Sequence, residues 1–129
     1  MEAAQRYLEA KERAPVGSEG WAKATAEAFD MLRLKACVEA AKPEWWNDEG
    51  LKALSARVVR AAPNEGAHTM QALVLCGRCG AWEEEPRSAA ELREAATCYE
   101  RVAALCNSPD VKADCSSRAD LCRRLAEAM

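Results

Sequence analysis

Apolar residues recur along most of this chain at intervals of three and four positions, the spacing of one face of an α-helix. The cleanest stripe lies between positions 92 and 106. It consists of Leu92, Ala95, Ala96, Tyr99, Val102, Ala103 and Cys106. The pattern predicts an all-α fold without strands.

Helix start signals separate the apolar stripes. These signals are Ser18, Asn47, Asn64 after Pro63, Ser88 with Glu91, and Ser108 with Pro109. Each begins with a residue type whose side chain caps free backbone N–H groups, and Ser88 with Glu91 has the spacing of a capping box. The sequence therefore predicts helices over about 2–14, 18–41, 48–62, 64–80, 88–106 and 108–126, arranged as five or six antiparallel helices.

Length and composition favour one helical domain over residues 1–129. A chain of 129 residues can bury a core without disulfides or a metal. Aromatic residues make up only 5%, and alanine is abundant, which favours closely packed helices. Within this domain we distinguish N-terminal helices over 1–44 from helical hairpins over 45–129.

Charge and cysteine content narrow the classes of partner and compartment. The net charge is −3, and charges of both signs are interspersed, so no basic stripe predicts nucleic-acid binding. No run approaches the roughly 20 apolar residues of a membrane-spanning helix. The seven cysteines are odd in number and fall mostly within helical patterns, which favours free, packed thiols. We therefore expect a soluble protein in a reducing intracellular compartment, either the cytoplasm or an organelle interior.

The segment from Pro63 to Gly80 resembles a junction of two tetratricopeptide repeats. A helix ends at Pro63, an Asn-containing turn follows, and the next helix runs to a glycine, as in that family. The segment 95–106 resembles the second helix of a repeat, with Ala95, Tyr99 and Val102 at the small and aromatic positions. The likeness covers residues 51–129, although the Trp-x-x-Leu-Gly signature is absent and the stretch 80–95 is longer than the family's turn.

The resemblance implies peptide recognition on the concave face formed by the first helix of each repeat. Carried over by position, it places these residues on that face: Met70, Val74, Arg78, Asp120, Arg123 and Arg124. Apolar Met70 and Val74 replace the polar residues by which some family members hold a terminal carboxylate. An apolar or mixed peptide, or a partner helix, is therefore the expected ligand. Trp45, adjacent to Trp46, is a further candidate anchor for a partner.

The strongest chemical motif is Cys76-Gly-Arg-Cys79, a spacing that can bind zinc or form a redox disulfide. The only histidine, His68, lies two helical turns before Cys76, and no second C-x-x-C is present. The motif also falls near a predicted helix C-terminus, where the dipole disfavours a thiolate. We therefore expect no metal or other cofactor and no enzymatic activity.

Three functions remain compatible with these patterns. The first is a protein–protein interaction module, a scaffold or adaptor of tetratricopeptide-like type that binds another protein or a peptide segment. The second is a small accessory subunit of a large multiprotein complex. The third is a thiol-based metal or redox protein that acts through Cys76 and Cys79.

Overall fold

A computed structural model describes residues 2–33, 44–77 and 87–129, and every regular element in these ranges is a helix. The elements are α1 (Glu2–Arg13), α2 (Glu19–Leu32), α3 (Asp48–Ala61), α4 (Glu65–Leu75), α5 (Ala89–Leu105) and α6 (Pro109–Glu127). This confirms the all-α class. None of the helices in the described ranges combines the length and apolarity needed to span a bilayer.

The side chains of the predicted cap residues accept hydrogen bonds from backbone N–H groups in the first turn. Ser18, Asn47, Asn64, Ser88 and Ser108 begin α2, α3, α4, α5 and α6 in this way. Ser88 and Glu91 form a full capping box, because each side chain accepts from the other's backbone N–H. These local bonds explain why the start of each helix was legible in the sequence.

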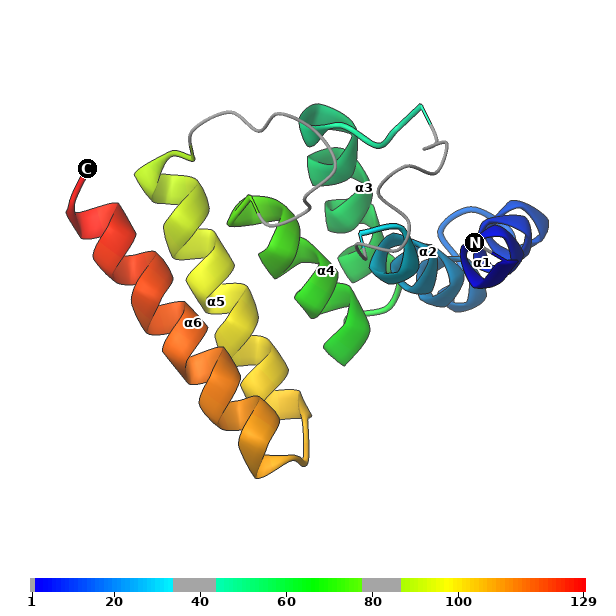
Figure 1. The fold of residues 1–129 in the computed structure, drawn as a ribbon. Helices are drawn as coiled ribbons and strands as arrows, with labels where there is room; N and C mark the ends of the chain where they lie inside the picture. The colour runs from blue at the N-terminus through cyan, green and yellow to red at the C-terminus, as the bar shows by residue number, and fades with distance from the viewer. Residues whose placement is uncertain (1, 34–43, 78–86) are drawn as a thin grey trace.

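The helices follow one another through space in chain order, with the two termini at opposite ends of the row (Figure 1). Each helix packs against the next, and α5 and α6 form the most extensive of these pairs. The most extensive contact between helices that are not consecutive joins α4 to α2. This contact brings together two helices that are separated in sequence by the whole of α3.

The core consists of two apolar clusters that meet in α4. The first lies among α2, α3 and α4, and includes Trp21, Phe29, Leu51, Val58 and Val74. The second joins α4, α5 and α6. Its buried members are Ala72, Leu75, Ala95, Ala96, Cys98, Tyr99, Val102, Cys115, Ala119 and Cys122. Small residues dominate this cluster, and they allow α5 and α6 to approach closely.

Two predicted helix ends are wrong. The helix α2 ends at Leu32, before the predicted end at 41, and the backbone N–H of its C-cap Arg33 donates to the Phe29 carbonyl. The helix α4 ends at Leu75, with Cys76 as its C-cap, whereas the sequence pattern extended it to Gly80. Gly77, directly after this C-cap, adopts a left-handed conformation at φ +76°. Residue 80, and residues 34–41 of the longer predicted helix, lie outside the described part.

The cysteines of the described residues are free thiols, and most of them fill space between helices. Cys98, Cys106, Cys115 and Cys122 are buried, and Cys76 is half-buried. Cys98 donates a hydrogen bond to Gln71 Oε1 at 3.3 Å, which ties α5 to α4. The expectation of packed thiols outside disulfides is confirmed for these five positions.

Four charged side chains fasten the start of α5 to α3. Lys52 forms ion pairs with both Asp48 and Glu91, and Arg87 lies 2.6 Å from Asp48 and 3.6 Å from Glu91. The Arg87 side chain is largely buried in this cluster. Because the cations share their carboxylates, the cluster joins two helices whose starts are far apart in sequence.

Candidate partner-binding groove

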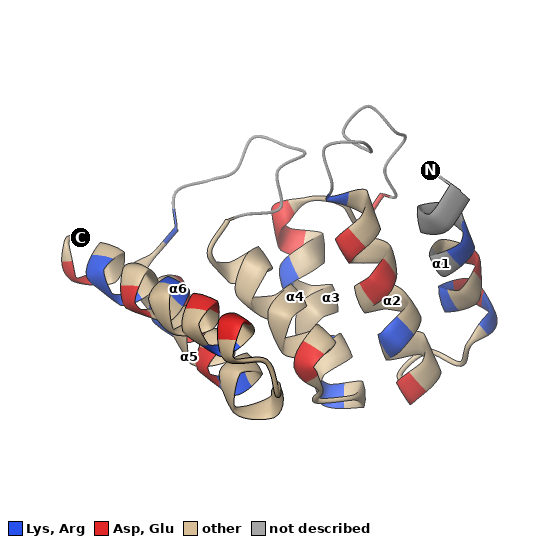
Figure 2. Ribbon diagram, turned by 60° about the horizontal axis from the view of Figure 1, so that its bottom comes forward, with Lys and Arg blue, Asp and Glu red and all other residues tan. Residues whose placement is uncertain are grey.

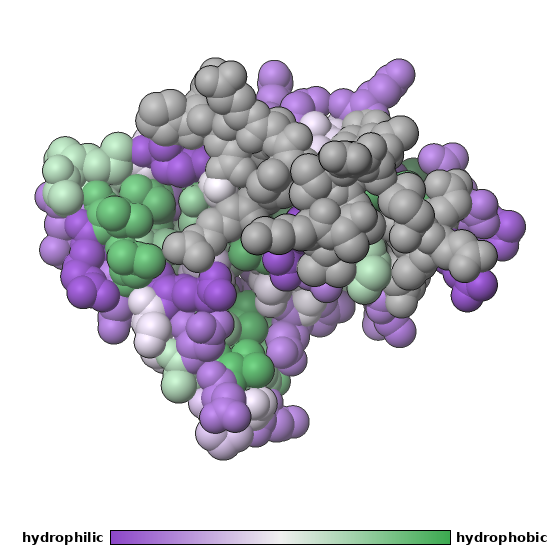
Figure 3. All heavy atoms as spheres, in the orientation of Figure 1, coloured by the Kyte–Doolittle hydropathy of each residue, from purple (hydrophilic) through white to green (hydrophobic). Residues whose placement is uncertain are grey.

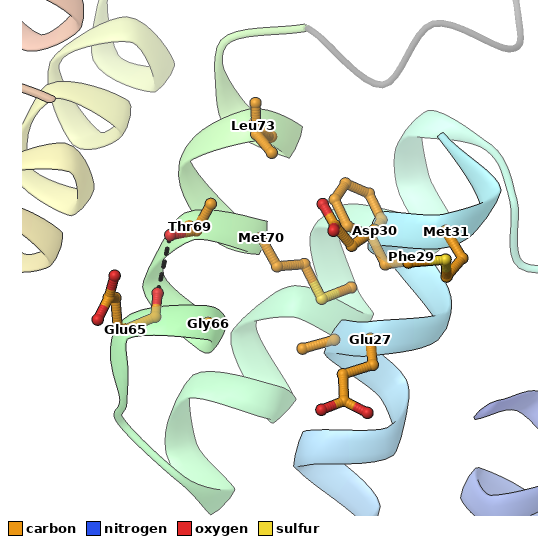
Figure 4. A pocket seen from close by; sticks show the side chains of 10 residues that line it. Glu27, Phe29, Asp30, Met31, Glu65, Gly66, Thr69, Met70 and Leu73 are labelled. Carbon is orange, nitrogen blue, oxygen red and sulfur yellow. Dashed lines mark hydrogen bonds between the residues drawn. The ribbon is translucent and has the colours of Figure 1, made fainter. Parts of the chain in front are cut away.

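A groove of about 420 Å³ lies between α2 and α4 in the described part of the structure. Its lining residues are Ala26, Glu27, Phe29, Asp30 and Met31 of α2, and Glu65, Gly66, Thr69, Met70 and Leu73 of α4. The groove exists because α2 and α4 lie side by side, while small residues such as Ala26 and Gly66 leave space between them. Figure 4 shows the groove from close by, with α4 on one side and α2 on the other.

The inner surface of the groove is apolar. The Met70 side chain reaches from α4 toward α2, and Phe29 and Met31 come from the opposite side (Figure 4). Phe29 is fixed behind the groove by its tilted stacking on Trp46, with ring centroids 5.4 Å apart. Met70 and Phe29 are each only 1% exposed and belong to the first core cluster, so the apolar surface open to a partner comes mainly from half-buried Ala26 and Met31. Such a surface suits an aliphatic or aromatic side chain of a partner.

Carboxylates border the groove on the α2 side. Asp30 points toward the gap in Figure 4, and it pairs with Arg33 at 2.8 Å. Glu27, one turn earlier, makes no ion pair with any residue that the structure describes. Glu65 lines the far end, but its carboxylate lies on the side of α4 turned away from α2. Acidic positions on the face of α2 are also visible in Figure 2. The rim is therefore acidic on one wall only.

The structure places Met70 in this groove but not its predicted neighbours. Val74 is completely buried in the first core cluster, so it offers no surface to a partner. Met70 belongs to the same core cluster, but it also lines the groove, whereas Val74 does not. Arg78 lies outside the described residues. Of the candidates on α4, Met70 alone lines the groove.

The three predicted residues of α6 lie apart from the groove, because none of them lines it. Asp120 and Arg124 are exposed, and Arg124 donates to the Asp120 carbonyl oxygen within the helix. Arg123 is half-buried and forms an ion pair with Glu100 of α5. These side chains therefore form a charged face on the α5–α6 hairpin.

Trp45 is half-buried and stacks on Trp46, with ring centroids 5.9 Å apart. Its other contacts are with α1, because the Lys11 ammonium lies 5.6 Å from the centre of its ring. Trp45 lines a second, smaller pocket at the junction of α1, α2 and α3. Trp45 does not line the α2–α4 groove.

Sequence reasoning missed the α2 half of the groove. Glu27 and Asp30 stand on the polar flank of the α2 stripe, which the sequence presents as an ordinary solvated face. The pattern indicates that the α2 stripe is buried, but it does not indicate which later helix packs along its edge. The only available clue was the small residue Ala26 between acidic and apolar positions.

The described residues provide no metal centre. Among residues 2–33, 44–77 and 87–129, no three His, Cys, Asp or Glu side chains converge in a way that could hold an ion. The Cys76 sulfur lies 3.4 Å from the Tyr99 hydroxyl, and it donates to the Leu73 carbonyl. His68 is buried, and its pKa is lowered by loss of water and by the nearby Arg101. Cys79, the partner in the C-x-x-C motif, lies outside the described part.

Comparison with known proteins returned no matching family model, no matching curated protein and no matching solved structure.

Proposed function

We propose that this protein is a non-catalytic interaction module whose α2–α4 groove binds a segment of another protein. The observation that carries the proposal is the apolar lining of the groove, which includes half-buried Ala26 and Met31, beside the carboxylates of α2. A segment that fits would insert an apolar side chain and place a lysine or arginine near Glu27. This is the adaptor function suggested by the tetratricopeptide-like pattern, now assigned to a specific groove.

The proportions of the groove support a peptide rather than a small metabolite. Its volume of about 420 Å³ suits one or two side chains, and its long direction follows the gap between two helices. The polar groups on its wall are carboxylates, together with the Thr69 hydroxyl, which is already bonded to the Glu65 carbonyl at 2.8 Å. Apolar contact therefore supplies affinity, and the carboxylates select for positive charge.

Selection from a random peptide display library tests the proposal. Wild-type protein should enrich peptides in which an apolar residue stands beside a lysine or arginine. The variant Thr69→Arg fills the groove with a cation and should abolish their binding. Thr97→Arg is the matched control. Thr97 lies on the exposed face of α5, and its hydroxyl donates to the carbonyl one turn earlier, as the Thr69 hydroxyl does.

Charge can be tested separately from shape. Glu27→Gln should weaken binding of the selected peptides by about three- to tenfold, whereas Glu94→Gln, at an exposed position of α5, should leave their binding unchanged. The proposal is wrong if no peptide is enriched, or if enriched peptides bind Thr69→Arg as well as wild type. Amide chemical shifts of Thr69 and Met70 should change on binding and locate the peptide.

A second candidate function is that of an accessory subunit held in a larger assembly. It is favoured by the apolar residues Leu121, Leu125 and Met129, which are 38%, 49% and 68% exposed toward the end of the chain. Figure 3 shows apolar side chains over the C-terminal part of α6. An isolated subunit should self-associate or have a low melting temperature, and Leu121→Glu should then reduce its self-association. A free module should remain monomeric and folded with either leucine or glutamate at position 121.

The thiol-based alternative has a direct test as well. Elemental analysis of purified protein together with thiol titration would detect it. One zinc per chain that is lost in Cys76→Ser would favour that function over the interaction module.

A further inference from the structure

A second pocket, of about 280 Å³, lies where α1, α2 and α3 converge. Its lining residues are Lys11, Val16, Trp21, Trp45, Gly50, Ala53, Leu54 and Arg57. They come from three helices and from the two segments before α2 and α3. The pocket shares no lining residue with the α2–α4 groove.

Two aromatic faces and two cations define the chemistry of this pocket. The Lys11 ammonium lies 5.8 Å from the centre of the Trp21 ring and 5.6 Å from that of Trp45. The Arg57 guanidinium lies 5.5 Å from the Trp21 ring. Trp21 is only 2% exposed, so the cations approach a rigid, buried aromatic group. The ring faces hold both positive charges beside one apolar surface.

No carboxylate lines the pocket. Lys11 and Arg57 form no ion pair with any acidic residue that the structure describes. The nearest acidic residues in sequence on the α3 side, Glu44 and Glu49, are exposed and are not part of the lining. Two unneutralised cations beside an apolar surface repel each other and attract an anion. The α2–α4 groove has the opposite charge.

We propose that Lys11, Arg57, Trp21 and Trp45 bind an acidic segment of a partner protein, in which a carboxylate side chain neighbours a bulky apolar one. The carboxylate pairs with the ammonium or with the guanidinium, and the planar guanidinium can donate to both carboxylate oxygens. The apolar side chain covers Trp45 and Val16, and Val16 is 67% exposed at the mouth of the pocket. This site is separate from the proposed groove and extends the function to a second kind of partner segment.

The binding experiment uses three acetylated and amidated hexapeptides with the full-length protein. The probe is Asp-Glu-Leu-Phe-Glu-Asp. One control, Asn-Gln-Leu-Phe-Gln-Asn, keeps the apolar pair without charge, and the other, Asp-Glu-Gly-Ser-Glu-Asp, keeps the charge without the apolar pair. Binding is followed by the indole N–H resonances of Trp21 and Trp45 in two-dimensional NMR. Blocked peptide termini ensure that only side-chain carboxylates are tested.

We expect the probe to bind with a dissociation constant of roughly 0.1–1 mM, a range typical of a short peptide on a shallow site. Each control peptide should bind at least fivefold more weakly. Raising the salt concentration to about 0.5 M should weaken the probe as well, since the cations are partly exposed. Failure of the probe to bind below about 5 mM, or equal binding of either control peptide, overturns the proposal.

Protein variants assign the binding to these side chains. Arg57→Gln and Lys11→Gln should each weaken the probe at least fivefold. Arg60→Gln is the matched control, because Arg60 is exposed on the same helix and lies outside the pocket. Equal losses of probe affinity in Arg57→Gln and Arg60→Gln would mean that net charge alone causes the effect, which would contradict the proposal. Thr69→Arg should bind the probe normally, so failure of the groove function and failure of this site are distinguishable.

Discussion

Replacing Gly50 by alanine tests how closely the segment that carries Trp45 packs against α3. An added Cβ at Gly50 would lie 2.5 Å from the Trp45 carbonyl oxygen and 3.1 Å from Asn47 Oδ1. Cβ atoms essentially never approach another atom within 3.0 Å. The Trp45 carbonyl also accepts a hydrogen bond from the Asn47 N–H at 2.9 Å, so it cannot move away freely.

The expected loss of stability follows from these contacts. Forcing backbone apart to accept an extra methyl group costs about 1–3 kcal/mol. Weakening the bond from the Gly50 N–H to Asn47 Oδ1, now 2.8 Å, costs about 1 kcal/mol more. Alanine returns about 0.4–1 kcal/mol, because it has less freedom than glycine in the unfolded chain. The net destabilisation should therefore be about 1–3 kcal/mol.

Gly20→Ala is the matched control. Gly20 lies in the first turn of α2, and a Cβ there would have no atom within 4 Å. Only the lower conformational freedom of the unfolded chain then affects stability, so Gly20→Ala should be more stable than wild type by about 0.4–1 kcal/mol. Urea unfolding followed by circular dichroism at 222 nm measures both variants.

The two substitutions should change stability in opposite directions. If Gly50→Ala proves as stable as Gly20→Ala, the close approach of the Trp45 carbonyl to α3 is refuted, and so is the shape of the adjoining pocket. If the contact is real, Gly50→Ala should also shift the Trp45 indole resonance, because Trp45 must move with its own carbonyl. Gly20→Ala should leave that resonance in place.

Three further predictions concern charge, capping and thiol chemistry. The hydrogen bond with Lys52 holds the pKa of Glu91 at about 2, below its ordinary 4.5. The contribution of ionised Glu91 to folding stability is therefore complete above pH 4.5 and is lost as the pH falls toward 2. Because the side chain is partly solvated, the loss is about 1 kcal/mol, and urea unfolding of Glu91→Gln should show a flatter pH profile than wild type over this window. Asn64→Ala should cost about 1 kcal/mol in urea unfolding through loss of the Asn64 Oδ1 bond to the Ala67 N–H, now 2.9 Å, while Asn107→Ala changes stability little; equal effects would argue against the cap. Burial raises the pKa of the Cys98 thiol to about 11, so about one thiol in a thousand is ionised near pH 8. Peptide mass spectrometry after iodoacetamide treatment should find Cys98 unmodified until the protein is unfolded, and rapid labelling in the folded state would contradict its burial.

Helix starts were predictable, whereas two helix ends were not. A cap such as Asn64 acts through its own next three residues, so the sequence contains the whole interaction. The end of α4 depends on where the chain adopts a left-handed turn, and both Gly77 and Gly80 allow one. In the structure α4 ends at Leu75, and Gly77 adopts the left-handed conformation just after its C-cap.

The candidate sites were even less accessible from sequence. Met70 and Val74 were both predicted to face a partner; both are buried in the first core cluster, and only Met70 also lines the groove. A helix that contacts α2, α3 and α5 has little free surface, so a stripe alone cannot separate its exposed edge from its buried side. The cationic pocket was missed for a similar reason, because Lys11 and Arg57 each look like ordinary surface residues.

The sequence by itself determined the all-α class, the start of each capped helix and the burial of the apolar stripes with their cysteines. These features depend on helical periodicity and on bonds within one turn, which are local. Only the tertiary structure decided that α2 and α4 lie side by side, and that Lys11 and Arg57 share an aromatic surface. Both arrangements depend on how separate helices pack, and small residues permit several packings of the same stripes, so no local pattern specifies them.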